Sequence, residues 1–246
     1  MEQRFLAILG LMCLAAPGVI WAGDPIRVLV VTGGHDFEQE PFFEVFKGEK
    51  DITYKWMEYP EAATMFYPDK RSSYDVIVFY DLFQGLTEDD KAALLDLLKN
   101  GKGVVALHHC IASHSDWPEY EKIIAAKYFL KDTEEGGKTY PKSTYNHDQK
   151  MNVHVCDPEH PITKGIKDFT IQDETYGGFR VMDGVHRLLE TDHPLSDKTI
   201  GWCHTYEKSK VVYIQLGHDH FAYDNPNYRR IVRQAIRWVD GKLGSE

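Results

Sequence analysis

The chain has 246 residues, which is long enough for one α/β domain with a sizeable core. It carries 28 Lys and Arg against 38 Asp and Glu, a net charge of −10, and this excludes a protein that binds nucleic acid through a basic surface. With 43% hydrophobic and 13% aromatic residues, a disordered chain is also excluded. The negative charge does not exclude neutral or cationic ligands.

The first 22 residues have the pattern of a secretory signal peptide. Arg4 precedes an uncharged run over residues 5–22, and Ala22 occupies a small-residue cleavage position. We therefore expect a secreted or periplasmic domain over residues 23–246, with no membrane contact after cleavage. An uncleaved anchor is the alternative, because the run just reaches spanning length.

Strand and helix signals alternate along the rest of the chain. Three β-branched runs predict parallel strands that are buried on both faces, at residues 26–31, 75–80 and 103–107. Residues 87–99 predict an amphipathic helix between the last two, with Thr87 as its N-cap and Asn100-Gly101 as its C-terminal stop. This combination is a βαβ unit.

The second half of the chain adds two helices and further strands. The apolar spacing predicts helices over residues 116–130 and 226–239, the latter capped by Asn225. Strands are predicted at residues 151–156, 169–171, 186–189 and 211–216. No repeat or linker interrupts the sequence, so a single doubly wound α/β domain with a mostly parallel sheet and antiparallel additions is expected.

Histidines follow three of the predicted strands. His35 comes after the first strand, His108-His109 after 103–107, and His218 after 211–216. Ligands bind outside the carboxyl ends of the strands in this architecture, and three imidazoles leave an open position on zinc. The pattern therefore predicts a divalent metal site on His35, His218 and one of His108 and His109. Structural or surface roles are expected for His147, His154, His160, His186, His193 and His204.

Two further groups could carry chemistry. Asp173-Glu174-Thr175-Tyr176 ends a predicted strand, and since adjacent side chains point to opposite faces, only one of the two carboxylates should face the pocket. Glu174 is favoured, as a general base or ligand; a solvated turn is the alternative. Arg180 and Trp202 could contact a polar ring-shaped ligand, or pack in the core. Cys110 follows the third strand, where some α/β enzymes place a nucleophile, but no glycine frames it and a buried thiol is favoured.

Several motifs in this order resemble the ThuA-like, or trehalose-utilisation, family. They are Val30-Val31-Thr32-Gly33-Gly34-His35, Gly103–His109, Trp117-Pro118-Glu119-Tyr120, His160-Pro161-Ile162-Thr163-Lys164-Gly165, Asp173-Glu174-Thr175-Tyr176 and Leu216-Gly217-His218-Asp219. The resemblance implies a flavodoxin-like, class I glutamine amidotransferase-like fold with His108 or His109 at the nucleophile elbow. It also implies processing of disaccharides such as trehalose, with keto-sugars as substrates. The sequence departs from the family pattern at Ala125-Ala126, where Gly-Gly is expected.

Together these features predict a secreted or periplasmic carbohydrate-processing enzyme that uses a divalent metal, with zinc as the expected ion. Its partner would be a small carbohydrate, and a homo-oligomer stays open. A non-catalytic carbohydrate-binding protein is the alternative; a thiol enzyme acting through Cys110 is a third. The predicted roles are His35, His108 and His218 as metal ligands, Glu174, Asp36 and His109 as catalytic groups, and Tyr176, Trp202 and Arg180 as sugar contacts.

Overall fold

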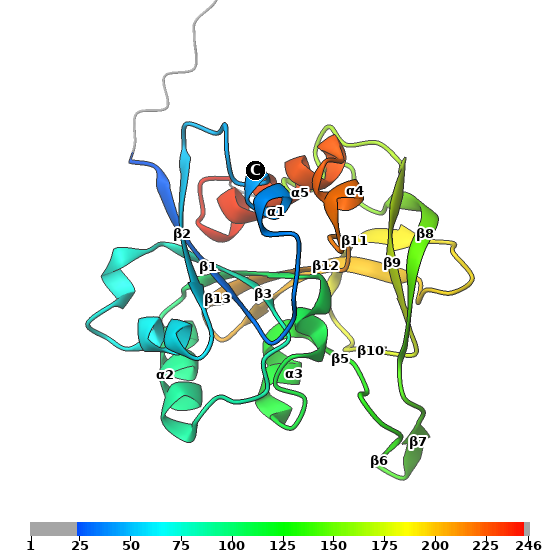
Figure 1. Cartoon of the computed structure of the whole chain (residues 1–246), viewed down its shortest axis with the longest axis horizontal. Coiled ribbons are helices and arrows are strands. Elements are labelled where there is room, and N and C mark those ends of the chain that lie inside the picture. The colour runs from blue at the N-terminus through cyan, green and yellow to red at the C-terminus, as the bar shows by residue number, and fades with distance from the viewer. Residues whose placement is uncertain (1–23, 244–246) are drawn as a thin grey trace, which may run out of the picture.

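The computed structural model describes residues 24–243. The predicted signal peptide over residues 1–22 lies outside the described residues. A sheet of nine strands runs through the molecule in the order β2-β1-β3-β4-β13-β12-β11-β8-β9 (Figure 1). Within the described residues, the helices are all too short or too polar to cross a membrane.

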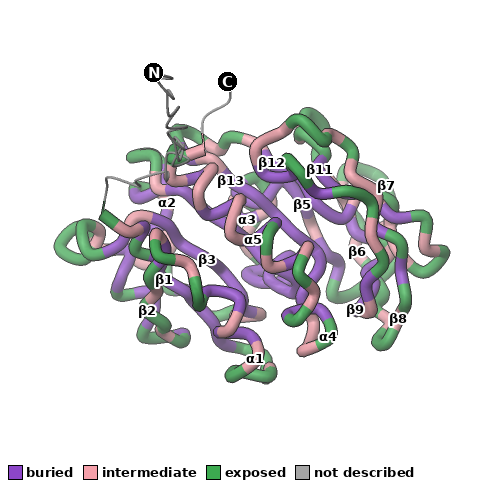
Figure 2. Tube along the Cα trace, turned by 90° about the horizontal axis from the view of Figure 1, so that it is seen from above, coloured by how far each residue is buried: buried purple, intermediate pink, exposed green. Residues whose placement is uncertain are grey.

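Five strands make up the parallel half of the sheet. They are β2 (Ile52–Glu58), β1 (Ile26–Gly33), β3 (Val76–Asp81), β4 (Gly103–Leu107) and β13 (Ser209–Ile214). Every residue of β3 and β4 is buried, as expected for strands covered on both faces (Figure 2). Parallel strands end at the same edge, so the carboxyl ends of β1, β3, β4 and β13 lie side by side.

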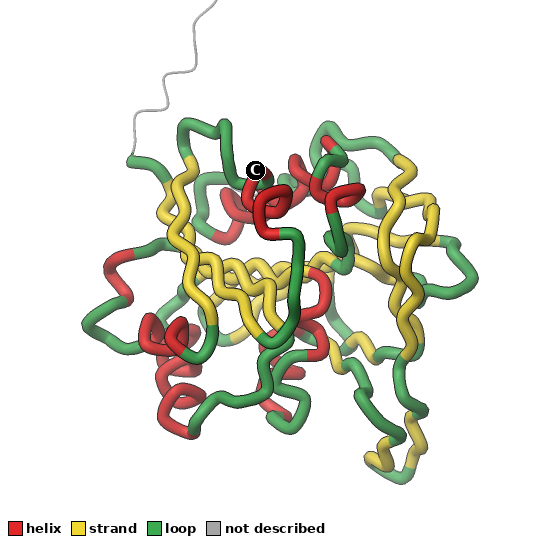
Figure 3. The backbone as a smooth tube through the Cα atoms, in the orientation of Figure 1, coloured by secondary structure: helices red, strands yellow, loops and turns green. Residues whose placement is uncertain are grey.

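Four antiparallel strands extend the sheet beyond β13. They are β12 (Thr199–Tyr206), β11 (His186–Thr191), β8 (Thr144–Val155) and β9 (Phe169–Gly177). The β8–β9 pair forms a long ribbon at one end of the sheet (Figures 1 and 3). Two small ribbons accompany it, β5 (Ala126–Lys127) with β10 (Arg180–Val181), and β6 (Thr133–Glu135) with β7 (Lys138–Tyr140).

Helices cover both faces of the sheet, each over its own hydrophobic core. One face carries α1 (Gln39–Glu44), α4 (His220–Tyr223) and α5 (Pro226–Val239). The other carries the 3₁₀ helix η1 (Glu61–Phe66), α2 (Glu88–Lys99) and α3 (Pro118–Ile124). Short 3₁₀ turns are η2 (Arg71–Ser73) and η3 (His108–Ala112). The doubly wound α/β prediction is therefore confirmed.

The predicted elements differ from the observed ones in two respects. The helix predicted over 116–130 is much shorter, because Ala125 takes the left-handed conformation, with φ of 58°, and ends α3. Strands β2 and β12 were not predicted. In β2, most side chains are exposed or half-exposed, so it lacks the continuous apolar run by which the other parallel strands were found.

Candidate functional site

Two histidines reach the carboxyl edge of the sheet through tight turns. His108 is the first residue of η3, directly after β4, and has a left-handed φ of 52°. This is the sharp strand-to-helix turn of a nucleophile elbow, with an imidazole in the nucleophile position. Gly217, with φ of 119°, turns the chain after β13 and brings in His218. An alanine at Gly217 would collide with the hydroxyl of Tyr228.

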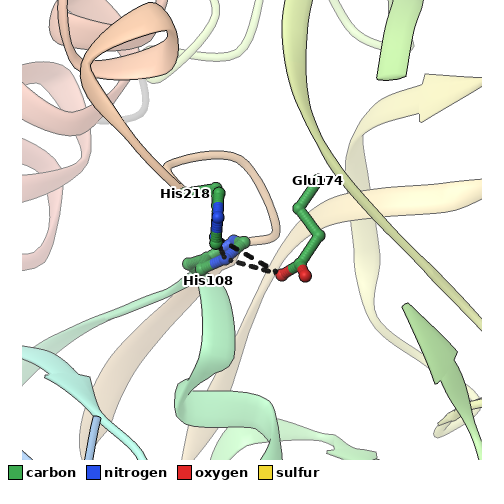
Figure 4. A group of neighbouring side chains, drawn as sticks. All are labelled: His108, Glu174 and His218. Carbon is green, nitrogen blue, oxygen red and sulfur yellow. Dashed lines mark hydrogen bonds and ion pairs between the residues drawn. The ribbon is translucent and has the colours of Figure 1, made fainter. Parts of the chain in front are cut away.

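Glu174 of β9 completes a group of three side chains with these histidines (Figure 4). His108 Nε2 lies 3.1 Å from Glu174 Oε2 and 3.3 Å from His218 Nδ1. The remaining pair, His218 Nδ1 and Glu174 Oε2, is 3.6 Å apart. The side chains of His108 and Glu174 are buried, whereas that of His218 is 22% exposed. The cluster therefore opens toward solvent on the His218 side.

The donor atoms have the spacing of metal ligands. Two ligands of a tetrahedral zinc, each about 2.0–2.2 Å from the ion, lie about 3.3–3.6 Å apart. His108 Nδ1 donates to the carbonyl of Gln215 at 2.7 Å, which leaves the Nε2 lone pair directed at the group. The hydroxyl of Tyr176 lies 2.9 Å from the same Nε2. Two imidazoles and one carboxylate suit catalytic zinc, and also ferrous iron.

Without a cation, His108 and Glu174 form a buried ion pair. Burial works to lower the pKa of His108, but the hydrogen bond and charge of Glu174 outweigh it, so the pKa is raised. Burial likewise works to raise the pKa of Glu174, but His108 outweighs it and the pKa is lowered. Burial and the neighbouring His108 lower the pKa of His218. Glu174 thus supplies a negative charge to the group, which a divalent cation would balance.

Asp173 holds this group in place from the opposite face of β9. Its buried carboxylate accepts hydrogen bonds from the backbone N–H groups of Gly217 at 2.8 Å, His218 at 3.0 Å and Glu174 at 2.8 Å. The loop after β13 is therefore tied to the strand that carries Glu174. The two adjacent carboxylates divide their roles as the alternation of strand side chains requires.

His147, for which the sequence predicts a structural role, joins the cluster through a β-bulge. The β8–β9 register shifts by one residue between Asn146 and Gln149, so that both His147 and Asp148 lie opposite Glu174. His147 Nδ1 is 3.2 Å from Glu174 Oε1. No sequence signal marked this residue, because a bulge depends on the partner strand as well as on the bulged one.

His147 also marks the open side of the cluster. Its Nδ1 lies 3.1 Å from His218 Nε2, so the two imidazoles stand side by side above Glu174. Its side chain is 52% exposed. Exposure therefore rises in order from His108 through His218 to His147, and a substrate would approach from the His147 side.

The structure does not bring His35 into the group of ligands. Its exposed ring stacks on that of His109, with the centroids 4.7 Å apart, and Glu174 stands in the position that the sequence analysis gave to His35. His109 is buried against Tyr80, and burial lowers its pKa well below the usual range. Asp36 is exposed beside His35. The chain turns away after β1 at two successive glycines of positive φ, which accounts for these positions.

Two predicted sugar contacts are engaged elsewhere. Trp202 has no exposed surface, and its Nε1 donates to the carbonyl of Ile124 at 2.9 Å, so its role is core packing. Arg180 donates to Glu121 at 2.5 Å and to Glu135 at 3.2 Å, so its guanidinium is already paired. Trp202 therefore has no surface to offer a substrate, and of the three predicted sugar contacts Tyr176 alone lies at the cluster.

The thiol of Cys110 is placed in the core. It is fully buried beyond the elbow, and burial raises its pKa well above the usual range. Cys156 is exposed and Cys203 is buried; neither these two nor Cys110 forms a disulfide. A neutral thiol without access to solvent is a poor nucleophile, so this geometry favours the buried, inert thiol.

Comparison with known proteins identifies relatives in sequence and fold. The sequence model of the ThuA family, described as trehalose utilisation, matches residues 27–239. No curated protein matches the chain. A ThuA-like protein from Parabacteroides merdae is 17% identical with a TM-score of 0.75, covering 91% of this chain and 92% of that one.

Two more solved structures show the same fold. A ThuA-like protein from Bacteroides uniformis is 20% identical with a TM-score of 0.68, covering 91% of this chain and 95% of that one. A cytoplasmic protein from Salmonella typhimurium is 11% identical with a TM-score of 0.61, covering 87% of this chain and 99% of that one. At these identities the likeness shows the architecture alone.

Proposed function

Because this chain belongs to the ThuA family, we propose that it is a carbohydrate-processing enzyme in which His108, Glu174 and His218 hold a divalent metal. The observation that carries the proposal is the spacing of their three donor atoms, 3.1, 3.3 and 3.6 Å. Zinc is the expected ion, because two imidazoles and one carboxylate are a donor set of catalytic zinc. The expected substrates are disaccharides or oxidised, keto-bearing glycosides.

The metal would polarise a sugar carbonyl or hydroxyl, or activate water. The protein groups orient and shield the reaction. Gln215 fixes the ring of His108 through Nδ1, and Asp173 fixes the backbone of His218. His147 presents a half-exposed imidazole on the open side, where it can exchange hydrogen bonds with a substrate hydroxyl. Secretion or periplasmic location is part of the proposal, supported by the uncharged run over residues 5–22.

A carbohydrate-binding protein without catalysis is the second candidate. The His108–Glu174 ion pair is complete without a metal, and the imidazoles of His147 and His218 could bond directly to sugar hydroxyls. The two candidates differ in their response to chelation. A protein that binds sugar through imidazoles alone keeps its affinity in EDTA, whereas a metal-dependent enzyme loses turnover and regains it on adding zinc.

Elemental mass spectrometry on tag-free protein tests the proposal. We expect about one transition metal per chain in the wild type and a loss of most of it in the His108→Ala, His218→Ala double variant. His154→Ala is the matched control, because this histidine of β8 is half-exposed and is bonded to Asp168 instead of the cluster. Absence of metal after reconstitution with zinc, manganese and ferrous iron would overturn the metalloenzyme.

A further inference from the structure

The β8–β9 ribbon turns one row of side chains toward the two histidines of the main sheet. Tyr145 lies directly opposite Tyr176, and His147 lies opposite Glu174. Residues opposite one another in an antiparallel pair share a face, and so do alternate residues along each strand. Tyr145 therefore stands on the same face as Glu174 and Tyr176, the two ribbon residues that contact His108.

Tyr145 is the one large aromatic of this face that is left open. Its side chain is 57% exposed, the highest value among the exposed large hydrophobic residues described, whereas Tyr176 and the neighbouring Tyr128 are buried. The ring of Tyr145 contacts that of His147, with the centroids 5.4 Å apart and the planes at 73°. Within residues 24–243, the hydroxyl of Tyr145 has no hydrogen-bond partner, so no such bond holds the ring in its exposed position. An uncovered aromatic ring thus borders the open side of the polar cluster.

We propose that Tyr145 is the platform on which a pyranose ring of the substrate stacks, and that it makes the site selective for cyclic sugars. The inference rests on the proposed function and adds the part of the ligand that is recognised. A pyranose has a flat face of C–H groups, which is stabilised by burial against an aromatic ring, and a rim of hydroxyls, which needs hydrogen-bond partners. Beside Tyr145, the half-exposed imidazole of His147 supplies such a partner.

Tyr145, rather than the predicted Trp202, has an exposed ring beside the cluster. Trp202 belongs to the core, so another aromatic must face the ligand if a sugar binds here. Tyr145 is two residues from His147 and reaches the same side of the ribbon. A ring that lies on Tyr145 would direct one edge toward His147 and the metal ligands behind it. An acyclic polyol offers similar hydroxyls but no rigid C–H face.

The test compares ligand binding by the metal-loaded protein and three variants, with isothermal calorimetry and saturation-transfer NMR. The probes are trehalose, methyl α-glucoside and the acyclic polyol sorbitol. We expect Tyr145→Ala to weaken binding of both cyclic sugars about tenfold or more, and Tyr145→Phe, which keeps the ring, to stay within about twofold. Sorbitol should bind weakly to all of them. Met182→Ala is the matched control, because Met182 is also exposed but lies in the cavity lined by His186 and Cys203.

The outcomes separate this inference from the proposed function. If the wild type binds trehalose or methyl α-glucoside and Tyr145→Ala binds it equally well, the stacking role of Tyr145 is overturned. The proposed carbohydrate function is then unaffected. Equal affinity of the wild type for sorbitol and the cyclic sugars also overturns it. If the metal-loaded wild type binds neither cyclic sugar, the platform is overturned together with the expectation that unoxidised glycosides are substrates. Metal content, measured in each variant, shows that the cluster is intact.

Discussion

The carboxylate of Asp173 is bonded to the backbone of His218, since its Oδ1 accepts the His218 N–H at 3.0 Å across 45 residues of sequence. The same carboxylate accepts the N–H of Gly217 through Oδ2 at 2.8 Å. A buried acid outside the cluster therefore sets where one of the proposed metal ligands stands. Asp173 is a positioning residue, and its removal should act through His218.

Asp173→Asn should weaken metal binding about 10–100-fold, the range typical for lost support of a ligand. The asparagine offers one acceptor oxygen where the carboxylate offers two, so a backbone N–H is left unpaired and unfolding becomes easier by about 1–3 kcal/mol. Competition titration with a chromogenic chelator measures the affinity. Asp197→Asn is the control, because Asp197 accepts the N–H of Phe179 in the same way. Equal metal affinity in both variants would remove the positioning role.

Asp81 should make stability fall as the pH rises. Its carboxyl is fully buried at the end of β3, and burial raises its pKa from 3.8 to about 7, although hydrogen bonds from Ser113 and from the N–H of Phe83 oppose this. Between pH 3.8 and about 7, the folded state therefore keeps a proton on Asp81 that the unfolded chain has already released. The contribution of Asp81 to the free energy of unfolding should decrease through this window, by up to about 4 kcal/mol, and level off above it.

The variant Asp81→Asn isolates this contribution. Urea unfolding of wild type and variant at about pH 5 and about pH 8 gives the difference in stability at each pH. The variant should gain on the wild type at the higher pH, since its amide has no proton to lose. Parallel profiles for the two proteins would mean that Asp81 titrates normally.

Trp202→Phe should lower stability without changing sugar affinity. The substitution leaves the carbonyl of Ile124 without its donor in the core, which costs about 1–3 kcal/mol, and removes volume beside Tyr213. Denaturant unfolding and calorimetry with trehalose measure the two effects separately. A fall in the affinity for trehalose at unchanged stability would indicate that Trp202 contacts the sugar.

Of the three cysteines within residues 24–243, we expect iodoacetamide to label Cys156 alone in the native protein, and slowly. Cys156 is exposed, and even there partial burial raises the pKa to about 11, so little thiolate exists at neutral pH. Burial raises the pKa of Cys110 well above its usual range and that of Cys203 to about 12. Peptide mass spectrometry locates the label, and denatured protein serves as the positive control. Rapid labelling of Cys110 in the native protein would support the hypothesis of a thiol enzyme that acts through Cys110.

The doubly wound fold was predictable because its signals are local. Strands β1, β3 and β4 are continuous apolar runs, and Thr87 and Asn225 cap their helices as expected. The alternation of these elements places their carboxyl ends at one edge, so histidines at that edge could also be anticipated. Likewise, period-two alternation predicted that only one of Asp173 and Glu174 faces the histidines, and Glu174 was the favoured one.

Which side chains meet at that edge was decided by the tertiary structure. His108 and His218 are 110 residues apart, and their contact depends on the turns that follow two different strands. Two glycines turn His35 away from the group, a one-residue bulge brings His147 in, and packing against Tyr213 takes Trp202 into the core. Sequence period and turn residues specify the elements, because those preferences act within a few residues. Convergence of side chains depends on the register and packing between elements, which no local pattern contains.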